Sequence, residues 1–268
     1  MMRYSDLHTH STFSDGKNTV EEMVQEAIAR NLLSIGLSDH SFTPFDTRYC
    51  MKQEVLEDYL AEVERVKEKY RGQIEVYTGL EWDGWSELQG RERFDYLIGD
   101  CHYIKAGGSY HSVDHAPEEH FGAMNDWFGG DALAYARAFF ETCVERTAVN
   151  RPDILGHFDL IRKFGSVKEE DPKYRDMATD AMLACLEVTP IVELNMNPLT
   201  RGYRSTPYPD SFLLKEILAH GGAVTVCSDA HRTDQLGGCF EQGFDWLRQQ
   251  GFKSVVMLHR GKFEEFGI

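Results

Sequence analysis

The sequence predicts an α/β fold in which parallel strands form a closed barrel covered by helices. Short apolar runs of strand character alternate with segments of helical apolar spacing, and this alternation is typical of a parallel sheet. Each strand-like run also ends in a polar or metal-binding side chain. Because the carboxyl ends of parallel barrel strands meet on one face, we expect one barrel domain over residues 1–268.

Six segments carry the apolar spacing of a helix. In the clearest two, which begin at Val20 and Ala178, apolar residues follow the i, i+3, i+4, i+7, i+8 pattern that places them on one face. Looser versions of the pattern begin at Leu56, Leu133, Leu214 and Phe240. We expect these helices to cover the sheet.

Seven strand-like runs cover residues 4–8, 34–40, 74–82, 96–102, 153–159, 191–197 and 223–231, and a further run covers 253–259. The connections on the face where the strands end are long. Residues 103–130 form a polar segment that far exceeds an ordinary loop, which predicts a lid or specificity loop. Shorter candidates for the same rim cover 41–52, 83–93, 159–171 and 196–209.

The composition limits the partners. A formal charge of -16, from 44 acidic and 28 basic residues without a basic cluster, argues against nucleic acid and anionic membranes. No apolar run approaches the length of a membrane span, and the six cysteines include no Cys-x-x-Cys pair, which favours free thiols in the cytoplasm. The composition does not assign an oligomeric state.

The strand ends and the first loop offer the ligands of a metal centre. His8 and His10 are two residues apart, so in a strand their side chains point to the same side. The candidate ligands are His8, His10, Asp15, His40, Glu81, His102, His157, Asp229 and His231. One ion uses about three or four protein ligands, so this set predicts two or three divalent ions and a bridging carboxylate. Such ligands suit zinc, manganese or iron.

These residues resemble the PHP (polymerase and histidinol phosphatase) superfamily. The motifs that carry the resemblance are, in chain order, "DLHTHSTFSDG", "LSDHS", "TGLEW", "GDCHY", "LGHFD" and "CSDAH". The resemblance extends from Asp6 to about Gly251 and implies a distorted (β/α)7 barrel with a trinuclear metal centre. The length and the stretches "GDCHYIKAGGSYHSVD" and "GHFDLIRKFG" are most similar to the monofunctional histidinol-phosphate phosphatases.

The resemblance also implies how three metal positions share the ligands. The first position takes His8, His10, Glu81 and Asp229. The second takes Glu81 as a bridge together with His102 and His157. The third takes Asp15, His40 and His231. A hydroxide that bridges the ions would attack phosphorus, while the ions and nearby arginines neutralise the phosphoryl oxygens.

Arginines and acids near the ligand strands are candidates for substrate binding and proton transfer. Arg162 follows "GHFDLI", and the resemblance implies that it contacts the phosphate. Arg201 and Arg204 follow the sixth strand, and of these two we favour Arg201. Asp39 and Asp159 lie near ligand histidines, where each would orient an imidazole or act as the general acid for the leaving group.

The expected activity is metal-dependent hydrolysis of a phosphate monoester, with L-histidinol phosphate in histidine biosynthesis as the leading substrate. A nucleotide or sugar phosphate, or a phosphodiester, is the alternative, because a fold does not determine its substrate. A non-catalytic metal-binding module would lack ligands, and none is missing. An eight-stranded metallo-amidohydrolase would need a further strand and a metal-bridging lysine, for which the sequence offers no clear candidate.

Overall fold

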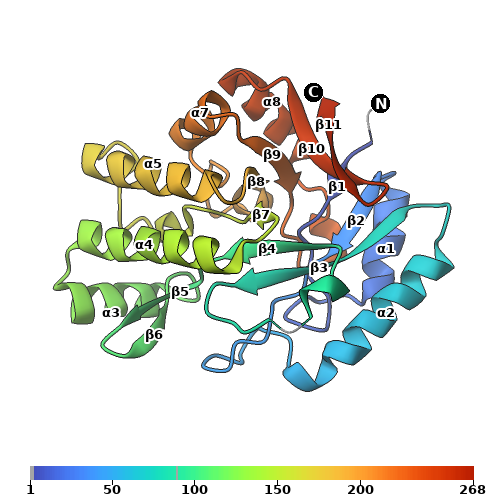
Figure 1. Cartoon of the computed structure of the whole chain (residues 1–268), viewed down its shortest axis with the longest axis horizontal. Helices are drawn as coiled ribbons and strands as arrows, with labels where there is room; N and C mark the ends of the chain where they lie inside the picture. The colour runs from blue at the N-terminus through green and yellow to red at the C-terminus, as the bar shows by residue number, and fades with distance from the viewer. Residues whose placement is uncertain (1–2, 89) are drawn as a thin grey trace.

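Parallel strands form a nearly closed barrel in the computed structural model, which describes residues 3–88 and 90–268 (Figure 1). Within these residues a seven-stranded sheet has the order β1-β2-β3-β4-β7-β8-β9. Its strands are β1 (Ser5–Asp6), β2 (Ser34–Leu37), β3 (Glu75–Asp83), β4 (Tyr96–Asp100), β7 (Ile154–Leu155), β8 (Ile191–Asn195) and β9 (Ala223–Cys227). A parallel bridge between Thr9 and Ala230 joins the two edges. The predicted α/β barrel is confirmed.

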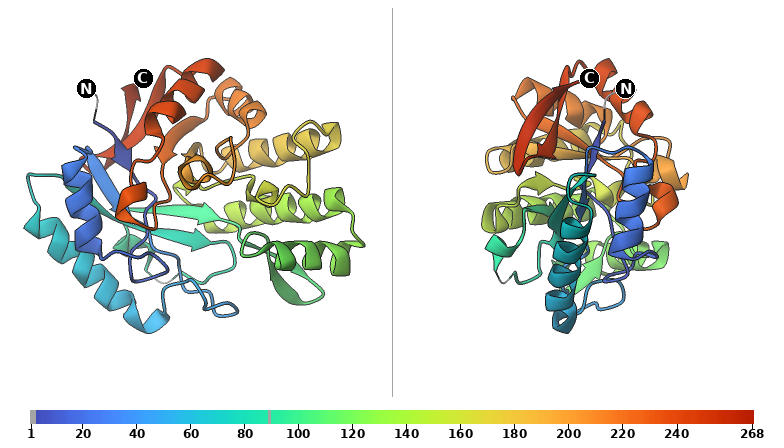
Figure 2. Two further views of the ribbon diagram at one scale, coloured as in Figure 1. Left: turned by 180° about the vertical axis from the view of Figure 1, so that it is seen from behind. Right: turned by 90° about the vertical axis from the view of Figure 1, so that its right-hand side faces the viewer.

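All six predicted helices are present and surround the sheet (Figures 1 and 2). They are α1 (Val20–Ala29), α2 (Leu56–Lys69), α4 (Ala132–Asn150), α5 (Pro172–Leu186), α7 (Ser211–Ala219) and α8 (Phe240–Gln250). Helix α1 begins at a capping box in which Thr19 and Glu22 each bond the other's backbone N–H. Among the described residues, no helix combines the length and the apolar character that a membrane crossing requires.

Residues 103–130 differ from the predicted loop or lid. They form an antiparallel hairpin of β5 (Tyr103–Ala106) and β6 (Ser109–Ser112), followed by helix α3 (Pro117–Phe128). Helix α3 starts with a proline and ends at Gly129, whose φ of 60° suits glycine. It fully buries only His120 and Ala123, so its apolar stripe is too short to show in the sequence. The predicted rim segment 196–209 likewise contains a short helix, α6 (Asn197–Arg201).

The barrel interior is packed with side chains. Tyr96 on β4 reaches across to the residue that follows β1, where its buried hydroxyl donates a hydrogen bond to the carbonyl oxygen of Leu7. Gly36 and Gly79 leave room for this ring, because a Cβ would lie 1.9 Å from the Tyr96 hydroxyl at Gly36 and 2.3 Å from the ring at Gly79. The two glycines are therefore part of the core packing.

A carboxyl-terminal hairpin covers the end of the barrel where the strands begin (Figures 1 and 2). It consists of β10 (Ser254–His259), which is the predicted last run, and β11 (Lys262–Gly267). The Ser34 hydroxyl, at the start of β2, donates to the carbonyl oxygen of Leu258 at 2.9 Å. The backbone N–H of Arg260 donates to Glu75, at the start of β3, at 2.9 Å. The opposite end of the barrel is left for the site.

Residues 1, 2 and 89 lie outside the described residues. Two predictions extend over them. The single domain over 1–268 includes all three residues, and the rim segment 83–93 includes residue 89.

Candidate metal centre

The carboxyl ends of the strands bring the nine predicted ligands together. Their side chains form four groups, among the described residues, in which the ligand atoms lie within 4.8 Å of one another. The groups are His8, His10 and Asp229; His8, Glu81 and His157; His40, Glu81 and His102; and His10, Asp15, His40 and His231. Shared members join the four groups, so the ligands form one continuous cluster.

Glu81, which lies within β3, is at the centre of this cluster. Its carboxylate oxygens lie 2.5–3.5 Å from ring nitrogens of His8, His10, His40, His102 and His157. Its side chain is only 1% exposed. A carboxylate shared by so many imidazoles has the position of a bridge between metal ions.

The cluster also contains buried polar atoms that lie close to other ligand atoms but make no hydrogen bond of suitable geometry. They are Nε2 of His8, both ring nitrogens of His10, Oδ1 of Asp15, Oε2 of Glu81 and Nδ1 of His102. Unpaired buried polar atoms are rare in native proteins, and here several of them gather in one place. Imidazole nitrogens and carboxylate oxygens together are a donor set for divalent transition metals. The residues therefore fit a group of divalent metal ions.

The carboxylates dominate the electrostatics of the cluster. Burial raises the pKa of Glu81, but the surrounding histidines outweigh it and lower that pKa well below its usual range. Burial lowers the pKa of His157, but Asp100 and Glu81 reverse this effect and raise the pKa to about 9. Burial and two neighbouring imidazoles lower the pKa of His10 to about 4. Without cations, the cluster thus combines an ionised Glu81 with a protonated His157 and a neutral His10.

Three further carboxylates lie behind the ligand histidines. The Nδ1 atom of His8 is 2.6 Å from Glu193, that of His157 is 3.3 Å from Asp100, and that of His102 is 3.5 Å from Asp83. Such carboxylates orient a metal-binding imidazole. None of these three carboxylates was predicted from the sequence to orient a ligand. A usable signal was present for two, because Asp83 follows Glu81 and Asp100 precedes His102 by two residues, the spacing that shares one face of a strand.

The two acids predicted to act on imidazoles or on the leaving group lie elsewhere. Asp39 accepts hydrogen bonds from the Ser11 hydroxyl at 2.7 Å and from the Ser14 backbone at 3.1 Å, so it fixes the loop that carries Asp15. Asp159 accepts from the backbone N–H of Asp210 at 3.1 Å. Neither carboxylate lines the pocket described next, and neither has a ligand histidine among its hydrogen-bond partners.

A pocket of about 220 Å³ opens beside the ligands, seven of which line it. Arg201 lines this pocket, as expected for a substrate-binding arginine. Lys163 lines it too, and its ammonium group lies 3.0 Å from the carboxylate of Asp114. Lys163 was not predicted from the sequence, although it directly follows the candidate Arg162. The pocket thus places two cations near the candidate metal centre.

Arg162 and Arg204 differ from their predicted role as substrate-binding residues. Arg204 Nη2 lies 3.0 Å from Oδ1 of the buried Asp210, and Arg162 pairs with the other oxygen of the same carboxylate. Burial and the neighbouring Asp210 raise the pKa of Asp159 well above its usual range. Neither arginine is among the residues that line the pocket, and both guanidinium groups pair with Asp210 instead.

The fold and the site define a metal-binding α/β barrel. The model of the PHP domain family matches residues 6–197. The chain therefore belongs to the PHP domain family, and the resemblance seen in its motifs is confirmed.

Known proteins with similar sequences match almost the whole chain. A Deinococcus radiodurans protein named "Probable histidinol-phosphatase" is 27% identical over 95% of this chain and 96% of its own length. The histidinol-phosphatase of Bacillus subtilis is 26% identical over 90% of this chain and 98% of its own length. The fold is similar to that of histidinol phosphate phosphatase from Lactococcus lactis, crystallised with zinc, L-histidinol and phosphate. That similarity has a TM-score of 0.73 at 18% identity and covers 98% of this chain and 100% of the other.

Proposed function

We propose that this protein is a metal-dependent phosphatase that hydrolyses L-histidinol phosphate to L-histidinol and phosphate. The observation that carries the proposal is the cluster of nine ligand side chains beside a pocket lined by Arg201 and Lys163. The match to histidinol-phosphatases over nearly their full length supports this substrate. The step belongs to histidine biosynthesis. The free cysteines of the protein support a location in a reducing compartment, the cytoplasm.

We further propose that the cluster holds two or three divalent ions, with Glu81 as the bridging ligand. The ligand sets implied by the family resemblance overlap with the groups in the structure, although His102 and His157 of the second set belong to different groups. Asp15, His40 and His231, for example, form one group with His10. When bound, the ions would offset the charge of the phosphoryl oxygens and lower the pKa of the water that attacks phosphorus. The chain's own contribution is to fix the ligands in buried, preoriented positions.

The two cations of the pocket fit the remaining charge of a phosphate monoester. The guanidinium of Arg201 offers a planar pair of donors, which matches two phosphoryl oxygens, and Lys163 adds a point charge. In the structure the ammonium group of Lys163 lies 3.0 Å from the carboxylate of Asp114. If Lys163 turns to the phosphate, that carboxylate loses this partner. The free carboxylate would then accept the ammonium group of histidinol. Tyr103 and Tyr203, which also line the pocket, supply aromatic surface for the imidazole.

The test compares phosphate release from L-histidinol phosphate with release from nucleotide and sugar phosphates, using protein loaded with zinc or manganese. We expect at least a tenfold preference in kcat/KM for histidinol phosphate, or about 1.4 kcal/mol in the transition state. Equal rates across the panel would contradict the substrate and leave the phosphatase chemistry. No release from any phosphate ester would contradict both.

A pair of histidine variants tests the site itself. His102→Ala should abolish phosphate release while the circular dichroism spectrum stays that of the wild type, because His102 belongs to a ligand group. His220→Ala is the matched control, since His220 lies at the exposed end of α7 and should keep full activity. Full activity in His102→Ala would argue against the ligand scheme.

A further inference from the structure

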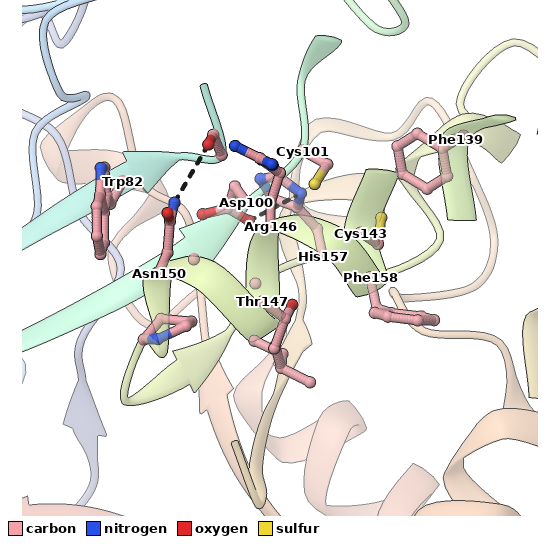
Figure 3. Close-up of a pocket in the computed structure, with 15 residues that line it drawn as sticks. Trp82, Asp100, Cys101, Phe139, Cys143, Arg146, Thr147, Asn150, His157 and Phe158 are labelled. Carbon is pink, nitrogen blue, oxygen red and sulfur yellow. Dashed lines mark hydrogen bonds and ion pairs between the residues drawn. The ribbon is translucent and has the colours of Figure 1, made fainter. Parts of the chain in front are cut away.

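A second, smaller cavity lies behind the candidate metal centre, between the strand ends and α4 (Figure 3). Its volume is about 20 Å³, which is enough for a single water molecule. His157 and Asp100 line it from the barrel, and Arg146 lines it from α4. Figure 3 shows these three side chains close together, with a dashed line that joins Asp100 to His157.

Three polar side-chain atoms around this cavity have no hydrogen-bond partner. The Asp100 side chain is 0% exposed, and neither of its carboxylate oxygens is paired by a hydrogen bond, although Oδ1 lies 3.3 Å from Nδ1 of His157. The Nε atom of Arg146 is also buried and without a partner. Burial of a carboxylate without a hydrogen-bond partner costs folding free energy. A hydrogen-bond donor is therefore expected beside Asp100.

Two glycines keep this arrangement open. A Cβ on Gly156 would lie 2.0 Å from Oδ1 of Asp100, and a Cβ on Gly84 would lie 2.7 Å from Cγ of Arg146. The guanidinium carbon of Arg146 is also 4.4 Å from the centre of the Trp85 ring, which holds the arginine in place. The surrounding chain is therefore shaped to admit both charged side chains.

We propose that Asp100 is a positioning residue for His157, and that one buried water molecule in the cavity joins Asp100 to Arg146. Nε2 of His157 faces Glu81 at 3.0 Å, so this nitrogen points into the metal centre. Nδ1 points the other way, and donation of its proton to Asp100 leaves the lone pair of Nε2 free for a metal ion. The water accepts from Nε–H of Arg146 and donates to the second oxygen of Asp100. This inference rests on the proposed metal centre.

The experiment measures zinc affinity by competition with a chromophoric chelator. Asp100→Ala should weaken zinc binding by roughly 10- to 100-fold, the range for residues that orient a metal ligand. Asp100→Asn keeps an oxygen that accepts from Nδ1–H, so it should lose much less affinity. Asp176→Asn removes an exposed carboxylate from α5 and is the matched control, with unchanged affinity. Circular dichroism of each variant verifies the fold.

The outcomes separate this inference from the proposed function. Wild-type zinc affinity in Asp100→Ala would overturn the positioning role and leave the metal centre intact. A wild-type protein that binds no zinc would overturn the metal centre and this inference with it.

A second measurement uses the wild-type protein, so its outcome does not depend on whether a variant folds. In the zinc-loaded wild-type protein, long-range proton–nitrogen correlation spectra should show the His157 proton on Nδ1. A high-resolution crystal structure should show one water within hydrogen-bond distance of Asp100 and Arg146. A proton on Nε2, or a dry cavity, would overturn the proposal.

Discussion

Glu81 is the residue on which most of the candidate ligands depend. Five imidazoles surround its two oxygens, and its side chain is buried. Glu81→Gln keeps the shape but removes the negative charge that faces these rings. We expect metal binding to weaken by at least roughly 10- to 100-fold, because even residues that only support a ligand have effects of this size. Metal content per chain after dialysis, measured by mass spectrometry, checks this.

Glu64→Gln is the control for Glu81→Gln, since Glu64 is exposed on α2. The control should retain the metal content of the wild type. A Glu81→Gln protein that retains the same amount would show that Glu81 is not a ligand.

Arg201 allows substrate binding to be separated from metal binding. It lines the pocket but belongs to none of the ligand groups, so Arg201→Met should lower kcat/KM by roughly 100-fold or more at unchanged metal content. Steady-state phosphate release and metal analysis of the same sample check this. The exposed Arg248, paired with Asp245 at 2.6 Å, provides the control Arg248→Met with normal activity. Normal kinetics in Arg201→Met would place the phosphate elsewhere in the pocket.

The role of a single residue could be predicted from the sequence only where the position of its backbone in the fold decides that role. All nine ligand candidates lie at strand ends or in the first loop, so the barrel brings them together once its strands are arranged in order. The roles of Arg162 and Arg204 depend instead on Asp210, a carboxylate remote in sequence from Arg162 that holds both guanidinium groups. Contacts of that kind depend on the tertiary fold, and no spacing in the sequence reports them.

At the level of elements, the packing between strands β2, β3 and β4 leaves the least room for a larger side chain. The ring of Tyr96 occupies the space over Gly36 and Gly79. Gly36→Ala should lower the free energy of unfolding by about 1–3 kcal/mol, the usual cost of overpacking. Urea denaturation checks this, provided that the variant and the wild type have the same m-value.

Gly122→Ala is the matched control for Gly36→Ala. Nothing lies within 4 Å of a Cβ at Gly122, which is within helix α3. The control should therefore be neutral or more stable by about 0.5–1 kcal/mol, because alanine favours a helix interior. Equal stability of the two variants would mean that the ring of Tyr96 moves aside at little cost.

The predicted elements and the missed ones differ in how much apolar surface they bury. Helix α1 buries Val20, Met23, Val24 and Ala27 at helical spacing, so its period is visible in the sequence. Helix α3 fully buries two residues, and one of them is His120, which bonds the carbonyl oxygen of Val113 at 2.7 Å. A buried polar residue weakens the apolar pattern of its own helix, so α3 could not be recognised from apolar spacing.

At the level of the whole molecule, bound metal and stability are linked. A ligand that binds only the folded state stabilises it, by about 2.7 kcal/mol when its concentration is one hundred times its Kd. Removal of the metal should also leave the ionised carboxylates of the cluster without the divalent charge that offsets them. We therefore expect dialysis against a chelator to lower the thermal midpoint and added zinc to restore it. Calorimetry with and without chelator checks this, and equal midpoints would contradict a metal-bound native state.

The bridge between Thr9 and Ala230 has a consequence for how the protein matures. Two of the four ligand groups in the described part of the chain need Asp229 or His231, and both groups also contain His10. A nascent polypeptide that has not yet emerged past residue 231 lacks these sites altogether. If the cluster binds metal ions as proposed, a chain released before these residues are made would therefore lack part of the ligand set.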